Sequence, residues 1–161
     1  MLMRIMEDNM NKAYHEKVIN DVIEQLKNLD IDAYVIITSE GSDQITSFIP
    51  GVGTVGSGAF IFTKNGEKYG ISSKIDAQDI EESGLFDEVI KYDSYDESVS
   101  SLMKKLAPKR VALNYSEKDP FCDGLTMGRY QKFIESLGGE VSFEEVSSDC
   151  FIPRVRENNP L

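Results

Sequence analysis

A run of apolar and β-branched residues, 33–38 (AYVIIT), is the feature that most limits how this chain can fold. A continuous apolar run of this kind is typical of a strand that is covered on both faces of a sheet. The residues before it, 12–29, place apolar side chains at steps of three and four, which predicts an amphipathic helix. The sequence therefore predicts a buried central strand that follows a helix.

The rest of the chain alternates between strand-like and helix-like segments. Residues 59–63 and 69–72 are predicted strands, and Asn65-Gly66 between them is a strong hairpin signal because both residues tolerate positive φ. The further predicted strands are 88–91, 110–113 and 141–146, and the predicted helices begin at Asp76, at the capping box Ser94-x-x-Glu97, and at Asp123 or Thr126. Alternation predicts an α/β fold, and the hairpin requires an antiparallel pair. We therefore expect three layers, with a mixed five- or six-stranded sheet and helices on both faces.

The length of 161 residues fits one domain. We expect residues 1–11 to be a disordered or frayed end, residues 12–150 to form the domain, and residues 151–161 to begin a linker. The side chains expected in the core are Val35, Ile37, Phe60, Phe62, Val89, Val111, Leu113 and Phe143.

Composition excludes several classes of function. Acidic residues outnumber basic ones by 28 to 17, for a net charge of −11, so a nucleic-acid partner is not expected. No apolar run approaches the ~20 residues of a membrane span, and the first residues do not resemble a secretory signal. Cys122 and Cys150 stand alone, which is typical of reduced thiols. These features predict a cytoplasmic protein without a membrane partner.

Residues 51–56 (GVGTVG) match the G-x-G-x-x-G dinucleotide motif by letter. That motif needs a helix N-terminus, where free N–H groups meet the pyrophosphate. A strand-like segment follows here, so we expect a loop that leads into a strand, or one that contacts a peptide or a neighbouring domain.

The sequence offers few residues from which a catalytic or metal-binding site could be formed. His15 is the only histidine, and its place on the polar side of the first helix predicts a surface residue. Paired carboxylates can hold two metal ions, but the acidic residues here fall at helix starts and on polar faces, where capping and solvation explain them. We expect neither catalytic nor metal-binding residues in this chain.

Four segments in order resemble the N-terminal domain of the creatinase, prolidase and aminopeptidase P family. They are residues 32–48 (DAYVIITSEGSDQITSF), 58–74, 110–130 (RVALNYSEKDPFCDGLTMGRY) and 151–157 (FIPRVRE). The third is the most specific, since it resembles the family's I-G-I-N-Y-S and A-D-G-L-T-x-G-x-Y patterns. Together they span nearly the whole chain.

The resemblance implies a ribonuclease H-like three-layer fold and a non-catalytic role in a Xaa-Pro peptidase, a hydrolase that forms a homodimer. The domain would shape the substrate cleft and mediate subunit contacts. It also implies a separate catalytic domain, in which two aspartates, a histidine and two glutamates hold two divalent ions of manganese, cobalt or zinc. None of those ligands lies in this chain, so the chain alone should be inactive. The family's creatine-binding arginine is absent, since residues 49–51 read I-P-G. The alternative is a free-standing protein- or peptide-binding module.

The loop of residues 39–58 is the candidate contact site. In the family a loop after the first strand can approach a neighbouring active site or subunit. Here the loop holds an aromatic residue among glycines, so we expect Phe48 to lie exposed and to contact a substrate or a second subunit, with Ser42 and Asp43 as weaker candidates. The alternative explanation is that the loop is a flexible surface segment without a function.

Overall fold

The computed structural model describes residues 2–160, which form one mixed sheet between two layers of helices. The strands are β1 (Ala33–Ser39), β2 (Ser57–Thr63), β3 (Lys68–Ser72), β4 (Glu88–Lys91), β5 (Arg110–Leu113) and β6 (Glu144–Ser147). The α-helices are α1 (Leu2–Leu29), α2 (Lys74–Ser83), α3 (Tyr95–Leu106), α4 (Met127–Ser136) and α5 (Ile152–Asn158). Three short 3₁₀ turns are η1 (Gln44–Ser47), η2 (Pro120–Cys122) and η3 (Ser148–Cys150).

The strand order is β4-β3-β2-β1-β5-β6, with β1 inside the sheet. β1 pairs antiparallel with β2 along its whole length, from Ala33 opposite Thr63 to Ser39 opposite Ser57. β2 and β3 form the antiparallel hairpin predicted from Asn65-Gly66, and the three remaining pairs are parallel. The predicted mixed, three-layer α/β fold is confirmed.

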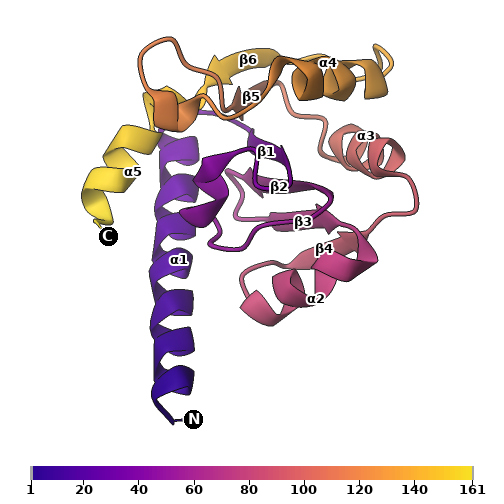
Figure 1. Cartoon of the computed structure of the whole chain (residues 1–161). Coiled ribbons are helices and arrows are strands. Elements are labelled where there is room, and N and C mark those ends of the chain that lie inside the picture. The colour runs from indigo at the N-terminus through magenta and orange to yellow at the C-terminus, as the bar shows by residue number, and fades with distance from the viewer. Residues whose placement is uncertain (1, 161) are drawn as a thin grey trace.

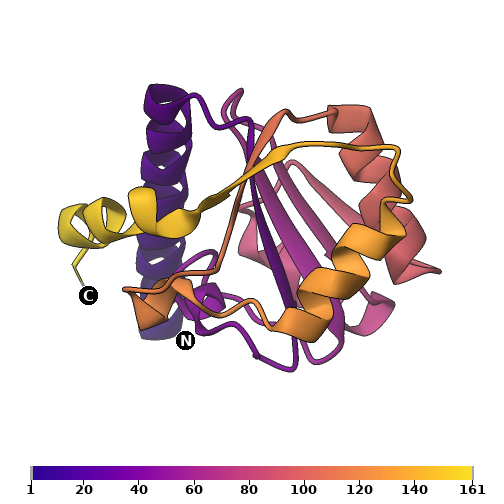
Figure 2. The same cartoon turned by 90° about the horizontal axis from the view of Figure 1, so that it is seen from above.

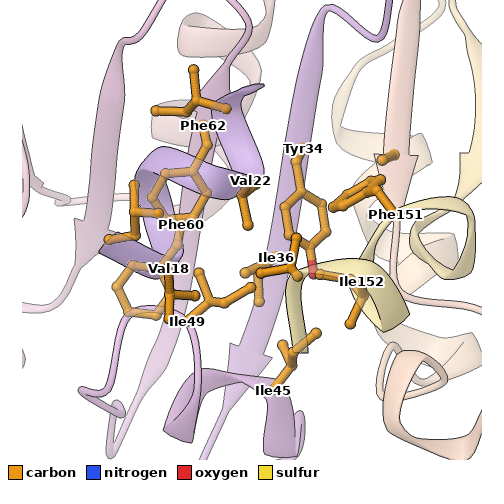
Figure 3. Packing of buried hydrophobic residues seen from close by; sticks show 14 of the residues in the cluster. Val18, Val22, Tyr34, Ile36, Ile45, Ile49, Phe60, Phe62, Phe151 and Ile152 are labelled. Atoms are coloured by element: carbon orange, nitrogen blue, oxygen red, sulfur yellow. The ribbon is translucent and has the colours of Figure 1, made fainter. Parts of the chain in front are cut away.

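Helices cover both faces of the sheet (Figures 1 and 2). α1, α2 and α5 contribute to one apolar cluster, and α3 and α4 contribute to the other. Along β1, Tyr34 and Ile36 point into the first cluster and Val35 and Ile37 into the second. Figure 3 shows the first cluster around Tyr34 and Ile36. Because both faces are covered, β1 needs apolar side chains at successive positions, which is why its sequence does not alternate.

Most of the predicted core residues are buried. Those that are at most 4% exposed are Val35, Ile37, Phe60, Phe62, Val111 and Leu113. Val89 and Phe143 are only partly buried. Val89 lies on the edge strand β4, and Phe143 precedes β6 at the opposite edge, so each lacks a neighbouring strand on one side.

The two ends of the chain differ from expectation. Residues 2–11, predicted to be frayed, are helical and continue α1. They are rich in good helix formers and extend a helix that residues 14–29 already anchor. The segment 151–160, predicted as the start of a linker, contains α5, and Phe151, Ile152 and Val155 are fully buried against α1 and the sheet. Within residues 2–160 no helix has the length and apolarity that crossing a membrane requires.

Asp32, just before β1, connects three strands through its carboxylate. It accepts hydrogen bonds from the backbone N–H groups of Lys109 (2.8 Å) and Arg110 (2.9 Å). It also forms an ion pair with the Lys64 ammonium group (2.9 Å). Partial burial raises the pKa of Asp32, but the hydrogen bonds from Lys64, Arg110 and Lys109 outweigh it and hold the pKa below 3.8.

We expect Asp32→Asn to lower the free energy of unfolding by about 1.5–3 kcal/mol at pH 7, because hydrogen bonds to a charged acceptor are lost. A depressed folded-state pKa gives stability that is complete above the unfolded value and is lost as the pH falls through the folded value. The difference from wild type should therefore shrink below about pH 4. Urea denaturation at several pH values measures it. Asp30→Asn is the control, since that side chain is 81% exposed and pairs with the same Lys64; an equal loss in both variants would contradict this role for Asp32.

Candidate functional site

The loop that follows β1 is compact, and it buries the aromatic residue that was expected to be exposed. Phe48, directly after η1, is only 5% exposed. Its ring packs edge-on against Tyr14 of α1 (6.5 Å between centroids) and Phe121 of η2 (6.0 Å). The expectation of an exposed Phe48 was therefore wrong, because α1 and η2 supply aromatic partners that are distant in sequence. A contact between Phe48 and a substrate or subunit stays a prediction.

Asp43 is also buried, and it belongs to a chain of hydrogen bonds beneath the loop. Asn114, immediately after β5, donates from Nδ2 to Asp43 Oδ2 (2.8 Å) and accepts at Oδ1 from the Tyr34 hydroxyl (2.6 Å). The backbone N–H of Ile45 donates to Asp43 Oδ1 (3.0 Å). Burial raises the pKa of the Asp43 carboxyl, and the bonds from Asn114 and Ile45 oppose that rise. Tyr34, Asp43 and Asn114 are each at most 1% exposed, so this buried network fastens the loop to the sheet.

The carboxylate also has a close backbone neighbour. A Cβ atom at Gly124 would lie 2.1 Å from Asp43 Oδ1, so a side chain at position 124 would collide with the network. Gly124, part of the most specific resemblance segment, is thus explained by packing. Ser42, by contrast, is exposed, and its Oγ accepts from the N–H of Ser39 (3.3 Å).

Two exposed apolar side chains near this loop were not singled out from the sequence. Val55 of the loop is 74% exposed, and Ile75 in the first turn of α2 is 85% exposed. Val55 is one of the variable positions of the G-x-G-x-x-G segment, and Ile75 directly precedes Asp76, whose carboxylate joins the loop to α2. If the loop contacts a substrate or subunit, Val55 and Ile75 are better placed to do so than Phe48.

Asp76 occupies two amides of the G-x-G-x-x-G segment, those of Val55 and Gly56. Its carboxylate accepts from the N–H groups of Val55 (2.9 Å) and Gly56 (3.0 Å) and from Ser73 Oγ (3.1 Å). A strand, β2, follows the segment as predicted. The predicted helix start at Asp76 was three residues late: Ser73 is the N-cap of α2, which leaves the Asp76 carboxylate free for the loop. Amides that already bind a protein carboxylate are not available to a phosphate.

His15 is not a simple surface residue. It is partly buried, and its Nδ1 lies 3.0 Å from the carbonyl oxygen of Phe48. Gly51 adopts φ +85° against the ring, where a Cβ atom would lie 2.3 Å from Nε2. The prediction of a surface residue missed this contact, because residues 48–51 fold back onto α1.

An aromatic groove of about 450 Å³ lies beside the buried loop. Phe48 and Phe121 form part of its wall, and the Arg156 guanidinium of α5 stacks over the Phe121 ring at 4.1 Å from the centroid. Pro153 and Pro160 also line it. Aromatic and proline surfaces beside a cation suit an extended peptide.

Among residues 2–160, no group of three or more His, Cys, Asp or Glu side chains is placed to hold a metal ion. Cys122 is buried and Cys150 exposed, and both are free thiols. Burial raises the pKa of Cys122 to about 12, which keeps it a thiol at neutral pH.

Comparisons with known proteins relate this fold to solved structures. Neither a protein-family model nor a curated protein matches the sequence. Solved structures do match. The X-Pro aminopeptidase of Thermotoga maritima MSB8 aligns with a TM-score of 0.65 and 16% identity, over 84% of this chain and 35% of the aminopeptidase chain. This chain therefore corresponds to about a third of that enzyme.

Shorter structures match almost end to end. An Xaa-Pro aminopeptidase structure from Streptococcus pyogenes aligns with a TM-score of 0.66 and 13% identity over 89% of this chain and 98% of that one. The N-terminal creatinase/prolidase-like domain of a protein described as a metallopeptidase, from Corynebacterium diphtheriae, aligns with a TM-score of 0.59 and 16% identity over 82% and 95%. The resemblance drawn from the four sequence segments is confirmed, and the chain has the fold of the creatinase/prolidase-like N-terminal domain found in Xaa-Pro peptidases.

Proposed function

We propose that this chain is the non-catalytic N-terminal domain of a Xaa-Pro peptidase, in which it shapes the substrate cleft and contacts a second subunit. The observation that carries the proposal is the pattern of coverage. The chain matches isolated N-terminal domains over 95% or more of their length, but only about a third of a complete X-Pro aminopeptidase. In this proposal the remaining two-thirds supplies the divalent metal ions and the catalysis.

We expect the 161-residue chain to be inactive toward Xaa-Pro peptides in the presence of manganese, cobalt or zinc. Metal-assisted hydrolysis needs at least three fixed ligands and an open coordination position, and residues 2–160 contain no such ligand group. The activity is measured as the release of the N-terminal residue of the peptide, which is monitored by chromatography. Turnover that co-purifies with the chain and disappears when one of its carboxylates is replaced would overturn the non-catalytic assignment.

A free-standing peptide-binding module is the second candidate, and the aromatic groove favours it. In that case proline-containing peptides should shift the NMR signals of residues that line the groove, such as Phe121 and Arg156, and Phe121→Ala should abolish the shifts. The gene distinguishes the two candidates. A reading frame that continues past residue 161 into a region with two aspartates, a histidine and two glutamates supports the accessory domain, whereas a stop codon supports the module.

A further inference from the structure

The first turns of α1 extend beyond the rest of the molecule (Figure 1). Five large apolar side chains on them are at least half exposed: Leu2 72%, Met3 75%, Ile5 50%, Met6 56% and Met10 70%. We call these five residues the α1 stripe. An exposed apolar surface that is concentrated on one element marks an interaction site more often than scattered apolar residues do.

Four members of the α1 stripe, Leu2, Met3, Met6 and Met10, lie on the side of α1 that faces away from the domain. At 3.6 residues per turn, these four are centred roughly 160° around the helix from the buried side chains of the second half, such as Val18, Val22 and Leu26, whereas Ile5 lies five turns before Ile23 and on the same side as it. One straight helix therefore carries two apolar sides. The second half packs on the sheet, and because of that packing the α1 stripe cannot turn toward the sheet. An occupant has to come from outside the domain.

We propose that the occupant is the α1 stripe of a second copy of this chain, in an antiparallel helix pair whose two-fold axis passes near Met6. Leu2, Met6 and Met10 follow one another at steps of four, so reversing the direction about Met6 places Leu2 of each copy beside Met10 of the other. An isologous contact requires this self-complementarity. Methionine side chains are flexible enough to pack against their own copies.

Charge favours this arrangement over other self-contacts. The chain has a net charge of −11, so surfaces of two copies generally repel each other. Residues 2–12 contain two basic and two acidic residues, and the α1 stripe contains no charge. In an antiparallel pair, the two acidic domains lie at opposite ends of a helical segment about 16 Å long, whereas a parallel pair would place them side by side.

The area is sufficient for a weak dimer. Five side chains with these exposures present roughly 600–700 Å² per copy, and a helix pair covers only part of a surface that spreads this far around α1, so the interface would bury at most about 1,200 Å² and falls in the small, weak class. We therefore expect a weak dimer whose population depends on the protein concentration. The inference specifies the subunit contact within the proposed function but does not depend on it, because it is measured on the chain alone.

Analytical ultracentrifugation across concentrations tests the pair with Met6→Lys, which brings two like charges to the two-fold axis. The dissociation constant should rise at least about tenfold. Asn11→Lys is the matched control: it adds the same charge to an exposed residue on the side of α1 away from the α1 stripe, and it should leave dimerisation unchanged. Circular dichroism checks that both variants keep their helices. Because each lysine reduces the net negative charge, loss of the dimer in Met6→Lys alone cannot come from general repulsion.

Cross-linking locates the axis. With Cys150 replaced by serine, Met6→Cys should form a covalent dimer when an added oxidant joins the two thiols, and Asn11→Cys should not. A wild-type chain that stays monomeric at several hundred micromolar would overturn the proposal. A Met6→Lys variant that still dimerises would also overturn it, because the contact would then lie elsewhere. Either failure leaves the peptidase assignment standing.

Discussion

Replacing Asn114 by alanine is expected to lower the free energy of unfolding by about 3–5 kcal/mol at pH 7, since it leaves two buried polar groups without their partner. The Tyr34 hydroxyl would lose its acceptor at 2.6 Å, and the Asp43 carboxylate would lose its side-chain donor at 2.8 Å. Both groups are fully buried. Urea denaturation followed by circular dichroism measures the loss.

The size of this loss should depend on pH. Burial already raises the pKa of Asp43, and removing the Asn114 donor, which opposes that rise, would raise it further. A carboxyl whose folded-state pKa lies above its unfolded value loses stability as the pH rises between the two values, so protonation relieves the variant more than the wild type. The difference between Asn114→Ala and wild type should therefore shrink as the pH is lowered from 7 toward 4.

Tyr34→Phe is the control for the network. It removes the hydroxyl and leaves only a neutral amide oxygen of Asn114 unpaired, so we expect a smaller cost of about 1–2 kcal/mol. The double variant should cost less than the sum of the two single ones, because both act on the same hydrogen bond. If Asn114→Ala loses less than about 1 kcal/mol, the network does not stabilise the loop as we describe.

Replacing Asp76 by alanine is expected to release residues 51–56 from α2 and to cost about 2–4 kcal/mol of stability. The Asp76 side chain accepts hydrogen bonds from Val55, Gly56 and Ser73, and it is only 5% exposed. Removing a buried charged acceptor leaves its donors unsatisfied. Hydrogen exchange at the amides of Val55 and Gly56 is the direct measurement, and both should lose protection.

Asp79→Ala is the matched control for this second prediction. Asp79 lies three residues further along α2, has the same side chain, and is exposed. We expect little change in stability and unchanged exchange at Val55 and Gly56. Equal effects of the two substitutions would show that a general change in the charge of α2, rather than the contact with the loop, is responsible.

The order and type of the secondary structure elements could be predicted from local sequence patterns. The apolar run of β1, the Asn-Gly hairpin and the helix start capped by Ser94 each depend on residues that are close along the chain, and the structure confirms all three. The mixed sheet followed from the hairpin. Errors in the elements arose at the chain ends, at Asp76, where the correct cap was a serine three residues earlier, and in the last strand, which was predicted over 141–146 but spans Glu144–Ser147.

The candidate site was much less predictable, because its contacts join residues that are far apart in sequence. Phe48 is an isolated aromatic residue in a glycine-rich loop, and its burial depends on Tyr14 and Phe121, which approach it through α1 and η2. Nothing in the local sequence of Asp43 indicates that it will be buried beside Asn114, 71 residues away. The same is true of the contact between the Asp76 carboxylate and the amides of Val55 and Gly56.

The sequence by itself determined the α/β class, the mixed sheet and the resemblance to the N-terminal domains of Xaa-Pro peptidases, because periodicity, turn residues and segment order are local or linear properties. The tertiary structure decided which side chains are exposed. Helix periodicity shows that α1 has apolar residues along its whole length, but only the docking of its second half on the sheet determines that the α1 stripe faces solvent. Burial depends on what packs against a residue, and that partner is set by the fold as a whole rather than by the residue's neighbours in the chain.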